Sequence, residues 1–354
     1  MSDSKPPAPP TVGLLNVDHS MVDWVAAARG AVLISIPVAI ATTTNLVAVG
    51  VFAAIGSLNI VLLQFAGTQS DRLRRSAWGL GLNALAVGLG TIVGTLGLLE
   101  IPLVAIGLIS IYLVYRIPGA GTLSLTVSAL FVIGVGLPGG SIAEAGARVV
   151  LVLLGGAVAL GGLALHIAAV RLRARASSMP GGRGTAELAS KPPAGPPEGW
   201  TNAFAVGITA AGGLALALAL GLERDYWIML TVVIVLRRSI EQTLSIGGAR
   251  VLGTVLGAAL AIGVTQGVAN DPLQGVLLVA FAFVMLSMIR ANYTFFAVFM
   301  TAFVIILLNL VYRGGVLLAE TRVLDTVLGG VLALTAATLL WFFVERPGGS
   351  PDRA

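Results

Sequence analysis

Two stretches of the chain decide its fold: RVVLVLLGGAVAL at residues 148–160 and RVLDTVLGGVLAL at residues 322–334. Each is an apolar run that opens on an arginine and carries a Gly-Gly pair. One offset of 174 residues superimposes the two arginines and the two Gly-Gly pairs. The same offset aligns two further pairs, Gly79 with Gly253 and Arg116 with Arg290. Because charged residues are scarce in this chain, a common offset indicates an internal duplication.

The composition indicates that the solvent of this chain is a lipid bilayer. Of its 354 residues 57% are hydrophobic and only 10% are charged, and the mean hydropathy is +0.97. Soluble domains carry about 25% charged residues. The formal net charge of +5 comes from basic residues in short loops, a pattern typical of membrane topology and not of a nucleic-acid partner. The absence of cysteine excludes disulfides and thiol nucleophiles.

The apolar runs predict about 12 transmembrane helices. A helix that crosses the hydrocarbon core needs about 20 apolar residues. Each half of the chain holds six such runs, so both copies would enter the membrane from the same side. The expected fold class is therefore an all-α polytopic membrane protein with two parallel six-helix repeats. The predicted helices are 25–41, 46–65, 76–97, 101–115, 121–137, 146–170, 202–222, 226–236, 249–267, 272–289, 293–313 and 321–344.

Composition also divides the chain into segments. We expect a disordered cytoplasmic tail at 1–23, a first repeat at 24–175, a Pro/Gly-rich linker at 176–199, a second repeat at 200–345 and a short cytoplasmic tail at 346–354. Lys and Arg predict the orientation, because they gather on the cytoplasmic side. Both termini are expected there, in the inner or plasma membrane. The basic residues assigned to that side are Arg72, Arg74, Arg75, Arg116, Arg171, Arg173, Arg175, Arg183, Lys191, Arg237, Arg238, Arg250, Arg290, Arg346 and Arg353.

No motif in the sequence points to catalysis. There is no metal-binding spacing of His and Glu, no phosphate-binding loop of an ATPase and no serine elbow. The stretch GVGLPG at 134–139 ends a predicted membrane helix and follows no strand, so it is interpreted as a chance match. We therefore expect no enzyme activity, no cofactor and no metal, and any energy coupling would come from an ion gradient or a partner.

Charged residues near the membrane are the candidate site, because an arginine at the bilayer centre usually faces a cavity or a partner. The eighth run has only 11 residues before Arg237-Arg238, too few to cross the core, so the helix is either tilted or broken there. The bland alternative for every arginine is that it extends to the headgroups or forms a structural ion pair. The substrate-binding candidates are Arg237, Arg238, Arg322, Arg148, Arg290 and Arg116, and the proton-coupling candidates are Asp325, Glu320 and Glu144.

The second half resembles the fusaric acid resistance protein-like (FUSC) family of the aromatic acid exporter superfamily, which is distantly similar to plant aluminium-activated malate transporters. The resemblance covers about 200–344. It implies a bundle of two six-helix repeats and export of organic, often aromatic, carboxylates. A sizeable cytoplasmic domain of the larger members is replaced here by the short linker. The motifs that carry it are YWIMLT at 226–231, RRS at 237–239, RVLGTVLG at 250–257, the stretch from Asn292 to Thr301, and RVLDTVLGG at 322–330.

Three functions remain open at this stage. The leading hypothesis is a secondary exporter of small organic anions, with aromatic carboxylates as the expected cargo. A passive anion channel would need the same basic path, and a membrane scaffold would use the buried charges only for packing. Beyond the lipid bilayer and the anion, coupling to protons and assembly into a homo-oligomer are left open.

Overall fold

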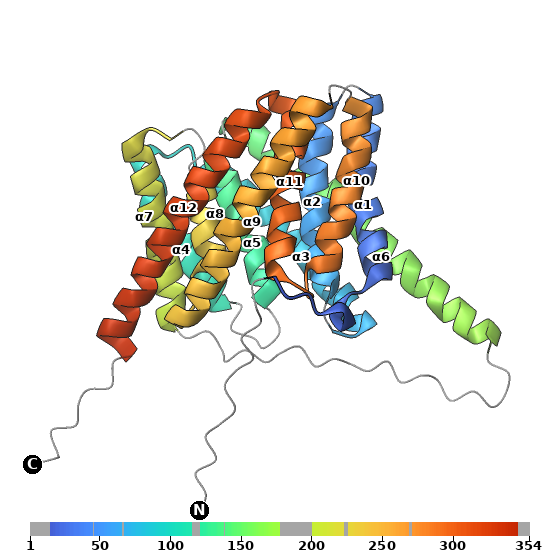
Figure 1. The fold of residues 1–354 in the computed structure, drawn as a ribbon, viewed down its shortest axis with the longest axis horizontal. Coiled ribbons are helices and arrows are strands. Elements are labelled where there is room, and N and C mark those ends of the chain that lie inside the picture. The colour runs from blue at the N-terminus through green and yellow to red at the C-terminus, as the bar shows by residue number, and fades with distance from the viewer. Residues whose placement is uncertain are drawn as a thin grey trace, which may run out of the picture.

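The computed structural model describes residues 15–44, 46–65, 67–114, 121–137, 139–177, 200–222, 226–268 and 271–345. The regular structure of these residues is helical throughout (Figure 1). The main helices are α1 (Trp24–Thr43), α2 (Val47–Leu62), α3 (Gln69–Val93), α4 (Glu100–Val114), α5 (Gly121–Gly136), α6 (Ile142–Ser177), α7 (Trp200–Leu220), α8 (Tyr226–Val235), α9 (Ile240–Gly267), α10 (Asp271–Met288), α11 (Tyr293–Tyr312) and α12 (Gly315–Leu340). Short turns of 3₁₀-helix lie at His19–Met21, Leu63–Phe65 and Gly97–Leu99, and a π-helical turn, Trp341–Glu345, follows α12.

Within the described residues, eight helices are long and apolar enough to cross a membrane. These are α1, α2, α3, α6, α7, α9, α11 and α12, and the four shorter apolar helices are α4, α5, α8 and α10. Every apolar run predicted to be a helix is one. The prediction of an all-α, multi-pass membrane protein is confirmed to this extent.

Several helices are longer than the apolar runs that predicted them. α3 begins at Gln69, because Thr68 and Asp71 form a reciprocal capping box at its start. α9 begins at Ile240 where 249 was predicted, and α12 begins at Gly315 where 321 was predicted. Hydropathy detects only the apolar middle of a membrane helix, whereas the helical hydrogen bonds continue into the polar interface.

The chain breaks between α8 and α9 instead of continuing as one helix. With 10 residues, α8 is about 15 Å long, roughly half the hydrocarbon core. The break leaves backbone groups of Arg237 without a helical partner, and Thr243 supplies one. The Thr243 hydroxyl accepts from the Arg237 N–H at 3.0 Å and donates to its carbonyl at 3.1 Å. Non-helical backbone is thus tolerated here because a neighbouring side chain satisfies it.

The same helix pairs pack against each other in both halves. α3 packs on α5 and α6, and α2 packs on α6. The helices six places later repeat this pattern, with α9 on α11 and α12, and α8 on α12. The halves also exchange contacts, because α1 lies against α10 of the other half and α4 lies against α7 (Figure 1).

Glycines allow the closest of these helix crossings. A Cβ at Gly155 of α6 would overlap the Ala53 carbonyl of α2. A Cβ at Gly329 of α12 would lie 2.8 Å from the Ile228 carbonyl oxygen of α8. Small residues at such positions let helix backbones approach in a bilayer, where packing replaces the hydrophobic effect as the driving force.

The segment before α1 differs from the disordered tail predicted for 1–23. The Asp18 N–H donates to the Ala291 carbonyl at 3.2 Å. The Asn292 side chain donates to the Asn16 carbonyl at 2.8 Å. The described part of this segment, from residue 15, therefore rests on the turn between α10 and α11. Residues 1–14, the linker from 178 onward and the tail at 346–354 lie outside the described residues.

Candidate anion-binding cavity

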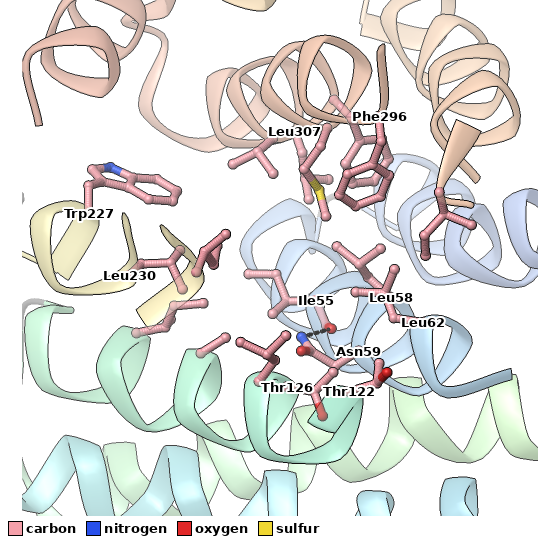
Figure 2. A pocket seen from close by; sticks show the side chains of 18 of the residues that line it. Ile55, Leu58, Asn59, Leu62, Thr122, Thr126, Trp227, Leu230, Phe296 and Leu307 are labelled. Carbon is pink, nitrogen blue, oxygen red and sulfur yellow. Dashed lines mark hydrogen bonds between the residues drawn. The ribbon is translucent and has the colours of Figure 1, made fainter. Parts of the chain in front are cut away.

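A cavity of about 880 Å³ lies between α2 and α5 of the first half and α8 and α11 of the second half (Figure 2). Its volume is within the range of about 300–1,000 Å³ that is usual for small-molecule sites. The four helices contribute equivalent positions. An offset of 175 residues relates Phe52, Ile55 and Asn59 of α2 to Trp227, Leu230 and Ile234 of α8, and all six line the cavity.

The two halves give the cavity chemically different walls. The first half contributes the polar side chains of Asn59, Thr122 and Thr126 (Figure 2). The positions on α11 that match the two threonines hold Phe296 and Met300. Asn59 donates its side-chain N–H to the Ile55 carbonyl at 2.9 Å. The cavity thus joins a wall of amide and hydroxyl groups to a wall of aromatic and aliphatic surface.

The charges that line the cavity are all positive. Among the described residues, those that line it include no Asp or Glu. The basic residues that line it are Arg75, Arg237, Arg250, Arg290 and Arg322. A low-dielectric cavity lined by charges of one sign concentrates the opposite charge, so this site favours anions.

Arg322 carries a buried charge without a hydrogen-bond partner. The residue is 2% exposed, and its Nε and Nη1 atoms have no partner among the described residues. The guanidinium carbon lies 3.7 Å from the centre of the Trp227 ring, which is a cation–π contact. The ring covers one face of the guanidinium. Its buried nitrogens still lack the acceptors that a charged group needs in a membrane protein.

Arg250 is a second buried arginine at the cavity. It lies on α9, is 2% exposed, and its Nε atom has no hydrogen-bond partner in the described structure. The sequence assigned Arg250 to a cytoplasmic loop as a topology charge. That assignment was wrong, because α9 begins ten residues earlier and carries Arg250 into the bundle.

Three further arginines lie at the end of the cavity where α3 and α11 begin and α8 ends. Arg75 and Arg237 are half-buried and Arg290 is exposed. The Arg290 Nη1 donates to the Phe65 carbonyl at 3.4 Å, and the Arg237 Nη1 donates to the Leu236 carbonyl at 2.9 Å. These residues form a basic opening to the same cavity.

The other predicted arginines do not line the cavity. Arg148 is buried, donates to the Thr91 hydroxyl at 3.0 Å and has its guanidinium carbon 5.9 Å from the centre of the Phe52 ring. Arg238 is exposed between α8 and α9. Arg116 lies outside the described residues. The duplicated arginines Arg148 and Arg322 thus stack on matching aromatic positions, but only Arg322 faces the cavity.

The predicted acidic residues have three different environments. Asp325 is 2% exposed on α12. Glu320 is exposed on the same helix. Glu144 is exposed at the start of α6, where it accepts from the Ser141 N–H at 2.9 Å while its own N–H donates to the Ser141 hydroxyl at 3.2 Å. Glu144 therefore serves as a helix cap.

The sequence did not single out Trp227 or Arg250 as site residues. Trp227 was interpreted as an interfacial anchor, whereas it is 5% exposed. One signal could have found it, because the 175-residue offset that places Phe52 on Trp227 holds along the whole of α2 and α8. For Arg250 the signal was a helical continuation through the polar residues 240–249, which hydropathy hides.

Comparison with known proteins places the second half in a family. Residues 210–336 match the family described as fusaric acid resistance protein-like. Inner membrane protein YccS of Escherichia coli (strain K12) is 29% identical over 140 residues, which are 40% of this chain and 19% of the relative. The match thus spans about a fifth of that relative's length, and no solved structure matches. Residues 210–336 are recognised as a fusaric acid resistance protein-like segment, as the sequence motifs predicted.

Proposed function

We propose that this protein is a secondary transporter that exports small organic anions, aromatic carboxylates in particular, across the plasma membrane. The observation that carries the proposal is the Arg322 guanidinium, buried at the cavity with two nitrogens that lack acceptors. The name of the bacterial relative, an inner membrane protein, supports the same location.

An anion is the ligand that this arrangement stabilises best. A buried charge without a partner is costly, and a carboxylate would supply the missing acceptors in charge-assisted hydrogen bonds. Arg250 adds a second buried guanidinium to the same cavity. The anion would compensate charges that the described lining residues leave uncompensated.

The apolar wall supports a ligand with an aromatic or aliphatic body. Phe296, Phe303 and Met300 of α11 lie across the cavity from the polar positions of α5. Burial of apolar ligand surface contributes roughly 25 cal/mol per Å². A planar carboxylate could therefore place its charge near Arg322 and its ring against α11.

We also propose that the cavity lies between two copies of one six-helix unit. The repeated helix pairs, the exchanged contacts α1–α10 and α4–α7, and the glycine crossings at matched positions support this duplication. Two parallel six-helix units that move against each other would open the cavity to alternate sides of the membrane. Asp325, buried three residues after Arg322, is the candidate for coupling this motion to protons.

Transport can be measured with purified protein in proteoliposomes. We expect a labelled aromatic carboxylate, benzoate as the first probe, to leave vesicles faster when they contain the protein, and faster again under a pH gradient. Empty vesicles are the control for diffusion of the protonated acid. Folded protein that moves none of a panel of aromatic and aliphatic carboxylates would contradict the proposal.

Trp227 offers a direct measurement of binding. The other four tryptophans, Trp24, Trp78, Trp200 and Trp341, are at least 41% exposed. A variant in which these four are phenylalanine would report only the buried ring beside Arg322. We expect benzoate to change its fluorescence in a saturable manner, because the carboxylate would enter the guanidinium–indole contact. Toluene, which has the same ring without the charge, is the matched control and should give a much smaller change.

A further inference from the structure

A second, smaller cavity lies away from the central one, at the end of the bundle where α1 and α3 begin. Its volume is about 230 Å³, the space of several water molecules. α1, α3 and α6 all contribute to it. Its polar lining residues are Asp23, Arg29, Gln69, Arg72 and His166.

The cations of this cavity are incompletely bonded. The Arg29 Nε is buried without a hydrogen-bond partner, and its Nη2 reaches only the Gln64 Oε1 at 3.5 Å. The Arg72 Nε donates to the Gly67 carbonyl at 3.0 Å, and no hydrogen bond from its terminal nitrogens to another described residue is seen. The charges of both arginines act on His166. The cavity therefore holds donors in excess of its acceptors.

The carboxylate in this cavity is already engaged. Asp23 accepts the Ala26 N–H at 2.9 Å and caps α1. Two guanidinium groups and an imidazole thus face one carboxylate that serves another purpose. Such a set of donors fits the tetrahedral oxygens of a phosphate group, which arginine binds through paired hydrogen bonds.

The surroundings indicate that the phosphate belongs to a lipid. Apolar side chains of α1 and α6 next to the cavity face outward, with Val25 63% and Leu165 74% exposed. Beyond the cavity, α6 extends away from the bundle (Figure 1) and carries the exposed residues Arg171, Arg173 and Arg175. Basic pockets between helices with basic segments beside them are where anionic headgroups bind.

We propose that Arg29, Arg72 and His166 form a binding site for the phosphate group of an anionic phospholipid, separate from the central cavity. Under the predicted topology this site lies at the cytoplasmic leaflet. The acyl chains would run along the outward face of α1 and α6. A lipid bound here would link the first helix to the helix that ends the first half.

The test is lipid retention by the purified full-length protein in native mass spectrometry. We expect phosphatidylglycerol to remain bound and phosphatidylcholine, whose headgroup has no net charge, to be lost. Arg29→Gln and Arg72→Gln should each lower retention roughly fivefold. Arg74→Gln is the matched control, because Arg74 is an exposed arginine of the same turn of α3, paired with Asp71 at 3.3 Å.

Two further measurements keep the outcomes distinct. Inorganic phosphate at millimolar concentration, added without lipid, should not raise the thermal stability of the protein, whereas phosphatidylglycerol should. Equal stabilisation by both, lost in Arg29→Gln, would show that free phosphate is the ligand and would overturn the lipid assignment. Retention that is unchanged in both arginine variants, each shown to be monodisperse, would overturn the site itself.

Discussion

Arg322→Met should abolish export while leaving the protein folded and at least as stable as the natural chain. Methionine fills a similar volume without the charge. Removal of one member of a buried charge pair costs about 2–5 kcal/mol of binding, so affinity for a carboxylate should fall roughly 100-fold or more. Without substrate the guanidinium is a buried charge that lacks acceptors. Its removal should therefore leave the free energy of unfolding unchanged or raise it by about 1–4 kcal/mol.

The matched control for this prediction is Arg148→Met at the duplicated position. Arg148 donates to Thr91 and does not line the cavity, so its loss should reduce stability more than the affinity for substrate. Proteoliposome efflux, Trp227 fluorescence and thermal unfolding in detergent measure the three quantities. A scaffold that uses Arg322 only for packing would show the opposite: lower stability, and no change in a ligand affinity that it does not have.

The helices could be predicted from the sequence because hydropathy measures the property that the bilayer selects. What could not be predicted was where each helix begins. The polar residues 240–249 and the capping box at Thr68 belong to helices whose ends leave the hydrocarbon, so composition shows nothing there. The position of Arg250 was missed for the same reason, since a helix start moved by nine residues changes a loop charge into a buried one.

The candidate site could be predicted only in part, because a membrane arginine looks the same in sequence whether it faces lipid, protein or a cavity. The duplication marked Arg148 and Arg322 as equivalent, yet Thr91 bonds to one and an open cavity faces the other. That difference arises from contacts between segments far apart in the chain. The polar and apolar walls likewise depend on which positions of α5 and α11 meet, which no single stretch of sequence states.

Gly155→Ala should strongly destabilise the fold. A Cβ at this position would overlap the Ala53 carbonyl of α2, which is backbone and cannot rotate away. Overpacking of this kind costs about 1–3 kcal/mol or more, and a larger side chain should cost more than alanine. We expect Gly155→Leu to give no monodisperse peak in size-exclusion chromatography and Gly155→Ala to give a reduced peak with a lower midpoint of thermal unfolding.

Gly161→Ala, on the same helix, is the control, because a Cβ there meets nothing within 4 Å. Alanine has the higher helix propensity, so this change should be neutral or stabilising by up to about 1 kcal/mol. The second half provides a test of the duplication with the same design. Gly329→Ala, whose Cβ would lie 2.7 Å from the Thr231 Cβ, should be destabilising, and Gly330→Ala, at an ordinary 3.8 Å from Val251, should not. If Gly155 and Gly329 tolerate alanine as well as Gly161 and Gly330 do, the matched close crossings of α6 on α2 and α12 on α8 are not what holds each six-helix unit together.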